Sequence, residues 1–247
     1  MGPASWHKEV MKDMINAGVN VFRVNFSHGD YETHRRTIRL VKELNEEFNC
    51  KTAVLADLQG PKLRIGDVED GAIINEGDVL TFTTNKVRGT AKLVYMNYQQ
   101  FPQDVNAGER ILLDDGKLMC EVLETNKKDT VVTKVIQGGP LKSKKGVNLP
   151  NTKVSLPCLT KKDLEDVVVA MEEGVEWIGL SFVRDAADVQ ELRKVINDFG
   201  SFAKIVSKIE KPEAVVDIDN IIDATDAIMV ARGDLGVEIP YSSVPMV

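Results

Sequence analysis

The sequence predicts an α/β fold with a small all-β domain inserted into it. Two stretches, 1–61 and 157–247, alternate segments of helical period with short apolar runs that end in polar residues, as buried parallel strands joined by helices do. Between them, in 62–156, the helical period is lost and short alternating or β-branched runs take over. Pro61 and Pro157 stand at the two junctions, so we expect the inserted domain to be a hinged lid.

The first α/β stretch is predicted to contain two helices and two strands. Ser5 is a suitable N-cap for a helix that ends before Gly18. A strand is expected at 19–25, a helix over about 30–48, and a short buried strand at 53–57. The alternation of helix and strand implies that the strands pair in parallel.

The inserted stretch is predicted to form a small antiparallel barrel or sandwich. The sequences EGD, DDG, NKKD and GGP are turn signals that separate its apolar runs. Strands are expected at 79–84, 110–113, 118–123 and 130–136.

After the second junction the alternation of helix and strand resumes. Thr160 is the expected N-cap of a helix that ends at Gly174. Beyond it we expect strands at 176–182, 204–208 and 227–231, and helices over about 185–199 and from about 212.

The last predicted helix opens at Pro212 and places four apolar side chains on one face, namely Ala214, Ile218, Ile221 and Ile222. No helix is expected to cover the strand that follows it. The chain stops at Val247, and the sequence therefore reads as a piece of a longer protein.

The five expected parallel strands all carry polar groups at their C-terminal ends. The catalytic residues of a TIM barrel lie at that edge, whereas a doubly wound sheet gathers its ligands at one switch point. We therefore expect a partial TIM (β/α)8 barrel, since five strands do not close an eight-stranded one. The polar residues at the strand ends are Arg23, Asn25, Ser27, Asp57, Ser181, Arg184, Lys208, Glu210 and Asp234.

Two acidic residues follow the last two strands in a pattern that suits a divalent metal. Glu210 and Asp234 stand at neighbouring strand ends, where two carboxylates can share one Mg²⁺. Lys208 points to the same side as Glu210, because strand side chains alternate. An ammonium beside a metal-bound phosphate is an arrangement for phosphoryl transfer. A surface Lys208–Glu210 ion pair, with Asp234 in a turn, fits the spacing equally well.

Seven strings in the sequence together resemble the pyruvate kinase family: RVNFSHG, ADLQGPKLR, LDDG, KKGVNLP, LSFVR, SKIE and MVARGDLGVEIP. The resemblance extends over essentially the whole chain. It implies a glycolytic phosphotransferase that transfers a phosphoryl group from phosphoenolpyruvate to ADP, giving pyruvate and ATP. It also implies Mg²⁺ or Mn²⁺ as the cofactor.

The resemblance assigns roles to single residues. Lys208 and Arg23 are the implied catalytic residues, and Glu210 and Asp234 the implied metal ligands. The implied substrate-binding residues are Arg23, Arg64, Ser181, Lys208, Gly233 and Asp234. The implied nucleotide-binding residues are Asn25, His28, Arg64 and Lys145, and the implied lid residues are Asp115 and Lys145.

Four of these residues also have plain structural interpretations. Ser181 can simply satisfy the end of a strand, and Asp115 in LDDG can be a type I′ turn residue. His28 can cap the helix that follows it. Arg64 can form a salt bridge at the hinge, although its place beside the mouth favours a grip on phosphate.

The resemblance implies a monovalent-cation position at Asn25, Ser27, Asp57 and the main-chain carbonyl of Leu58. Here Lys62 stands where K⁺-dependent members carry a carboxylate. A fixed ammonium near Asp57 can supply the charge of that cation, so we expect K⁺ to be dispensable.

Composition bounds the partners and the compartment. A net charge of −7 argues against a general nucleic-acid or membrane surface. The three cysteines have no metal-ligand spacing and fit reduced thiols in the cytoplasm.

The resemblance implies a homotetrameric parent enzyme, of which this chain lacks the first, seventh and eighth barrel strands and a C-terminal domain. The alternatives are a non-catalytic fragment that keeps metal and phosphate sites, or an aldolase or lyase acting on pyruvate enolates.

Overall fold

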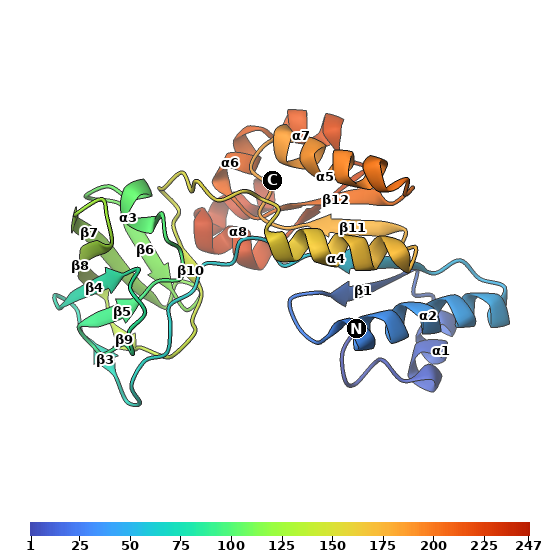
Figure 1. The fold of residues 1–247 in the computed structure, drawn as a ribbon, viewed down its shortest axis with the longest axis horizontal. Helices are drawn as coiled ribbons and strands as arrows, with labels where there is room; N and C mark the ends of the chain where they lie inside the picture. Colours follow the sequence, from blue (N-terminus) through green and yellow to red (C-terminus); the bar gives the residue numbers. More distant parts are fainter. The chain divides into compact units, whose positions relative to one another are not determined.

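The computed structural model describes all residues from 1 to 247, and the chain forms two compact units (Figure 1). The first unit consists of Met1–Pro61 and Pro157–Ala231, and the second of Lys62–Leu156 and Arg232–Val247. The sequence places 232–247 with the barrel, whereas here this segment groups with the inserted stretch. One contact that ties it there is the hydrogen bond that Asn148 Nδ2 donates to Glu238 Oε1, at 2.8 Å.

The first unit is built on one parallel sheet of five strands. They are β1 (Val21–Asn25), β2 (Ala53–Asp57), β11 (Trp177–Leu180), β12 (Lys204–Ile209) and β13 (Ala227–Val230). Their spatial order follows their order in the chain, and every neighbouring pair is parallel. A doubly wound sheet reverses its strand order at a switch point, and this sheet does not. The expected partial TIM barrel is therefore confirmed.

Helices connect these strands and cover the sheet. They are α1 (Lys8–Asn16), α2 (Tyr31–Phe48), α4 (Lys161–Glu172), α5 (Ala186–Phe199), α6 (Pro212–Val216) and α7 (Ile218–Ala224). α2 packs on β1 and β2, and α5 packs on β12. Side chains cap the starts of three of these helices: Asp30 caps α2, a Thr160–Asp163 capping box begins α4, and Asp185 caps α5.

Two helix predictions are wrong in detail. Ser5 is not an N-cap, because its hydroxyl is engaged in a local turn with Gly2 and α1 begins only at Lys8. The helix predicted from Pro212 is broken at Asp217, whose carboxylate accepts a hydrogen bond from Ala186 N at 3.1 Å.

The break changes which apolar side chains of that segment are covered. Ala214 and Ile221 are buried, but Ile222 is 48% exposed, so the four apolar residues do not share one face. After β13 the chain also forms helix α8 (Arg232–Glu238) and a 3-10 helix (Tyr241–Met246), where no helix was expected.

The second unit carries a six-stranded sheet in the order β10–β6–β7–β8–β4–β5. Its strands are β4 (Val79–Thr83), β5 (Leu93–Tyr95), β6 (Arg110–Leu113), β7 (Leu118–Thr125), β8 (Thr130–Gln137) and β10 (Val147–Asn148). The four predicted strands are present. The sheet is antiparallel except for β4 and β5, which pair in parallel.

The second unit also contains a small ribbon, a short helix and a core of its own. The ribbon pairs β3 (Ile73–Ile74) with β9 (Gly139–Pro140), and the helix is α3 (Phe101–Asp104). Apolar side chains on the inner faces of the strands, such as Phe82, Ile111 and Val131, form one buried cluster. Across the whole chain, none of the helices combines the length and the apolar composition that crossing a bilayer requires.

Candidate active site

The C-terminal ends of β1, β2, β11 and β12 bring five polar side chains together in the first unit. The strand register explains this, because Asn25 pairs with Asp57, Asp57 with Gly179, and Leu180 with Ser207. Residues at or just past these positions therefore share one edge of the sheet. The five side chains are Arg23, Asp57, Ser181, Lys208 and Glu210.

The ammonium of Lys208 is the centre of this cluster. Its Nζ lies 2.9 Å from Glu210 Oε1 and 3.2 Å from Asp57 Oδ1, and it donates to Ser181 Oγ at 2.7 Å. Lys208 is 9% exposed and Glu210 is 1% exposed, so the pair is buried and the surface ion pair considered above is excluded. Burial lowers the pKa of Lys208, but the negative charges of Glu210 and Asp57 outweigh it and the net pKa is raised. The side chain is thus a fixed cation at neutral pH.

Asp57 links this ammonium to a guanidinium. Its Oδ2 accepts from Arg23 Nε at 2.6 Å, while its Oδ1 forms the ion pair with Lys208. Oδ1 accepts no hydrogen bond and is held by the ion pair alone. Two cations and two carboxylates therefore form one compact group, in which one carboxylate oxygen is ion-paired without a hydrogen bond.

Ser181 satisfies a strand end, as one of its two interpretations expected, and its direct role toward a substrate stays a prediction. Its hydroxyl donates to the carbonyl of Leu58 at 2.7 Å, which satisfies a strand end, and it accepts from Lys208. The next residue, Phe182, donates its main-chain N–H to Glu210 Oε2 at 2.8 Å. The turn after β11 therefore contacts both members of the Lys208–Glu210 pair.

The loop between β1 and α2 carries Asn25, Ser27 and His28. Asn25 Oδ1 accepts from Ser27 N at 2.9 Å, and His28 is exposed. His28 does not cap α2, since the capping side chain is that of Asp30.

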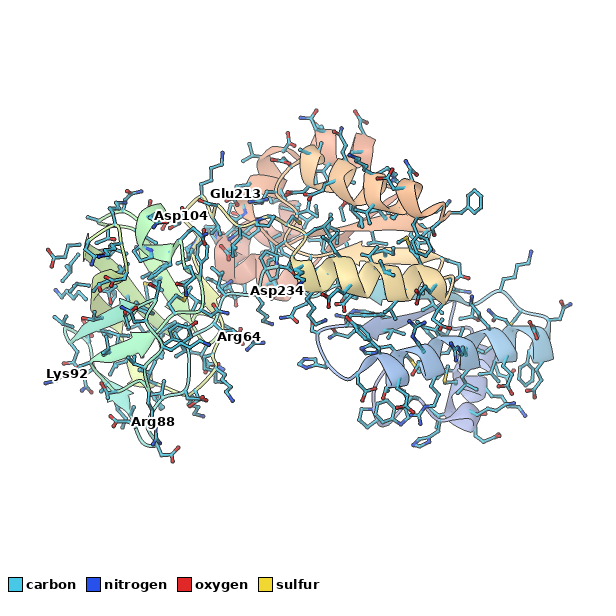
Figure 2. All side chains as sticks on the ribbon, viewed as in Figure 1. Arg64, Arg88, Lys92, Asp104, Glu213 and Asp234 are labelled. Carbon is cyan, nitrogen blue, oxygen red and sulfur yellow. The ribbon has the colours of Figure 1, made fainter.

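Part of the predicted site lies on the second unit. Arg64 (labelled in Figure 2) forms a β-bridge with Gly146 and donates from Nη1 to the carbonyl of Lys144 at 2.8 Å. Lys145 Nζ lies 2.9 Å from Asp114 Oδ1. The hydrogen bond from Lys145 lowers the pKa of Asp114, and the one from Lys117 lowers it to a smaller extent. These contacts gather Arg64, Lys145 and the β6–β7 turn on one side of this unit.

Asp115 occupies the β6–β7 turn with its side chain exposed. Lys117 N donates to Asp114 O at 3.2 Å, and the two central residues, Asp115 and Gly116, have φ values of 58° and 81°. Positive φ at both central positions is the mark of a type I′ turn, so the structural interpretation of Asp115 holds for its backbone. Sequence reasoning missed Asp114 as the partner of Lys145, although the DD pair at the turn was a usable signal.

Three further predicted residues also belong to the second unit. Gly233 and Asp234 lie in the first turn of α8, directly after β13, and both are exposed. Lys62, expected to replace a monovalent cation, is exposed as well. The two expected metal ligands, Glu210 and Asp234, thus come from different units, and their joint metal site stays a prediction.

The donor set fits a hard divalent cation better than a soft one. No three His, Cys, Asp or Glu side chains lie close enough together to hold a metal by themselves. Mg²⁺ commonly takes one or two carboxylates and fills its other positions with water and substrate oxygens. The buried Glu210 carboxylate, with the incompletely hydrogen-bonded Asp57 beside the same ammonium, is compatible with that mode of binding.

Comparison with known proteins gives one consistent family. Residues 1–247 match the family described as pyruvate kinase, barrel domain. The chain is 41% identical to a pyruvate kinase of Corynebacterium glutamicum over 250 residues, which are 100% of this chain and 52% of that protein. It is 42% identical to a pyruvate kinase of Geobacillus stearothermophilus over 250 residues, 100% of this chain and 43% of that protein. It is also 41% identical to pyruvate kinase 2 of Synechocystis sp. over 251 residues, 100% of this chain and 42% of that protein. The chain thus spans about half the length of the curated relatives it matches.

Proposed function

The chain belongs to the pyruvate kinase family, and on this basis we propose that it supplies most of an active site that transfers a phosphoryl group between phosphoenolpyruvate and ADP, giving pyruvate and ATP. The observation that carries the proposal is the buried, protonated Lys208 at the C-terminal edge of the barrel sheet, beside Arg23. A fixed cation at that place stabilises the charge that a phosphoryl group spreads over its oxygens during transfer.

The other residues of the site have supporting roles in this proposal. Arg23 binds the phosphate, because a planar guanidinium offers several donors at once. Asp57 and Ser181 hold the two cations in place, since each contacts Lys208 or Arg23 directly. Glu210 and Asp234 would hold Mg²⁺, which supplies charge neutralisation at the phosphoryl group when it is bound. Gly233 lets the main chain approach the substrate carboxylate.

The nucleotide is assigned to residues of both units. We place Asn25 and His28 of the β1–α2 loop, with Arg64 and Lys145, at the ADP phosphates. Lys145 and Asp115 would contribute by closing the second unit as a lid, which excludes water. Lys62 makes K⁺ dispensable in this proposal, because its ammonium supplies a permanent positive charge.

The proposal also includes the cellular compartment and the oligomeric state of the protein. Cys50, Cys120 and Cys158 are all free thiols, which fits work in the reducing cytoplasm. The partners are the two substrate pairs and further copies of the protein in a homotetramer.

The proposal is tested by measuring pyruvate formation, and the binding of phosphoenolpyruvate by calorimetry, for the 247-residue chain and for Lys208→Met. Turnover should fall by about 10²–10³-fold in the variant, because a preorganised charge at the transition state is removed. Lys204→Met is the matched control: Lys204 begins the same strand, at its opposite end, and is exposed.

If the 247-residue chain binds phosphoenolpyruvate and also forms pyruvate, the result supports an active enzyme. Binding without turnover in the chain supports a non-catalytic piece that keeps the phosphate site. Equal binding by the chain and by Lys208→Met contradicts the assignment of the site. Running the titrations in potassium chloride and in tetramethylammonium chloride tests the role of Lys62, and binding that needs K⁺ contradicts it.

A further inference from the structure

Phe182 has a backbone conformation that its residue type disfavours. Its φ is +56°, in the left-handed region. Six non-glycine residues of the chain have positive φ, and the other five are Asn, Asp or Lys residues in turns and loops. Asparagine and aspartate enter this region readily, whereas for a bulky residue it is a true outlier. Such a conformation persists only where the surroundings enforce it, and it gathers at functional sites.

Neighbouring segments of the first unit hold Phe182 in this state. Its ring packs on Gly60, where an added Cβ would lie 2.8 Å from Phe182 Cδ2. Gly60 is itself fixed, because its N–H donates to the fully buried Asp163 carboxylate at 3.0 Å. Ser181, the residue before Phe182, is also held, because its hydroxyl donates a hydrogen bond to the carbonyl of Leu58. The turn is therefore locked from both sides.

The consequence of the left-handed turn is the direction of one N–H group. Phe182 N donates to Glu210 Oε2 at 2.8 Å, and Glu210 is 1% exposed. The other carboxylate oxygen faces the ammonium of Lys208 at 2.9 Å. A change of Phe182 to negative φ would rotate the peptide between Ser181 and Phe182 and turn this N–H away from Glu210.

We propose that Phe182 is a positioning residue for a divalent metal ion: its left-handed backbone fixes the orientation of the Glu210 carboxylate. This inference rests on the proposed function, in which Glu210 is a metal ligand. Partners that orient a ligating carboxylate tune the affinity for the metal, and their loss typically costs about 10–100-fold.

The test compares two substitutions of similar size, Phe182→Asn and Phe182→Val, in the 247-residue chain. Both remove the ring and its packing on Gly60. Asparagine tolerates positive φ, whereas β-branched valine does not. The probe is Mn²⁺, which shares the oxygen ligands of Mg²⁺, and its affinity is measured from the free ion by electron paramagnetic resonance.

We expect Phe182→Asn to bind Mn²⁺ nearly as the unchanged chain does, and Phe182→Val to bind it about tenfold more weakly or worse. Equal affinities for the two variants would overturn the inference while leaving the proposed function intact. Failure of the proposed function looks different: the unchanged chain then binds no Mn²⁺, or Glu210→Gln binds it equally well.

Folding is checked independently by circular dichroism during thermal unfolding. If Phe182→Val does not fold, Phe182→Gly and Phe182→Ala form a second pair with the same contrast in backbone preference. Amide hydrogen exchange of residue 182 in the metal-free chain gives a further readout. We expect this amide to exchange slowly in the unchanged chain and in Phe182→Asn, and fast in Phe182→Val. Equal exchange rates in all three proteins would contradict the proposal.

Discussion

Single residues in the first unit are held by charges that balance one another. Lys208 faces two carboxylates, and Asp57 faces two cations, so neither can be removed without leaving a buried charge short of a partner. Breaking a buried ion pair by removing one partner costs much more than replacing both. The same contacts that we assign to phosphoryl transfer therefore also stabilise the fold.

Stability at alkaline pH should depend on Lys208. Its pKa in the folded chain is raised above the ordinary 10.5 by Glu210 and Asp57, against the opposing effect of burial. A raised pKa means that its contribution is complete below pH 10.5 and is lost as the pH rises through the folded value. We expect Lys208→Met to be about 3 kcal/mol less stable than the unchanged chain at pH 8, and this gap to shrink at pH 11 and above.

The measurement is urea unfolding of both proteins across that pH range. Lys204→Met serves again as the control, since Lys204 lies on the same strand and is exposed. A gap between Lys208→Met and the unchanged chain that stays constant up to the highest pH would show that the ion pairs do not stabilise the fold.

At the scale of elements, α4 anchors the loop that follows β1. Lys162 Nζ donates to the carbonyl of Phe26 at 2.9 Å and to Asp166 Oδ2 at 2.5 Å. The other oxygen of the fully buried Asp166 accepts from Tyr31 OH at 2.8 Å. The rings of Phe26 and His34 lie 4.4 Å apart and close the loop onto α2. Side chains of α2 and α4 thus set the path of the segment that carries Asn25, Ser27 and His28.

Lys162→Met should loosen this loop. The substitution removes the donor to Phe26 and leaves Asp166 with Tyr31 as its partner, which we expect to cost about 2 kcal/mol of unfolding free energy. Amide exchange over 26–30 should become faster, and the calorimetric affinity for ADP should fall. The matched control is Lys161→Met, because Lys161 is the exposed neighbour on the same helix. Unchanged exchange over 26–30 would mean that α4 does not hold the loop.

At the scale of the whole molecule, the two units differ in how well the edges of their sheets are covered. Both sheets are open, with edges at β1 and β13 in the first unit and at β10 and β5 in the second. No residue of β13 is buried, and Ile228 is 41% exposed, whereas β5 and β10 bury Val94 and Val147. Segments with few buried apolar side chains open at a lower free energy than the core does.

The first unit should therefore unfold at a lower urea concentration than the second. Both tryptophans of the chain, Trp6 and Trp177, lie in the first unit, so tryptophan fluorescence reports on it alone. The second unit is followed by amide exchange in β4, β7 and β8. Two separate transitions are expected, with the fluorescence change first. A single coincident transition would mean that the chain unfolds as one cooperative body.

The sequence by itself determined the elements whose signals are local. The strands at 53–57 and 110–113 were predicted to within about a residue, and the helix capped by Thr160 begins where predicted, because apolar period and capping chemistry act over a few residues. The gathering of Arg23, Asp57, Ser181, Lys208 and Glu210 could also be predicted, since the C-terminal ends of parallel strands must share one edge.

Tertiary structure decided the rest, because the partners involved are far apart in the chain. The helix break at Asp217 depends on the start of α5, and the double pairing of Asp57 depends on β1 and β12. The string LSFVR carries no signal for the left-handed Phe182. That conformation exists because its ring packs on Gly60, Leu58 holds the preceding Ser181, and Glu210 accepts its N–H. Local preference predicts where elements form, but only packing between distant segments can impose a conformation that local preference disfavours.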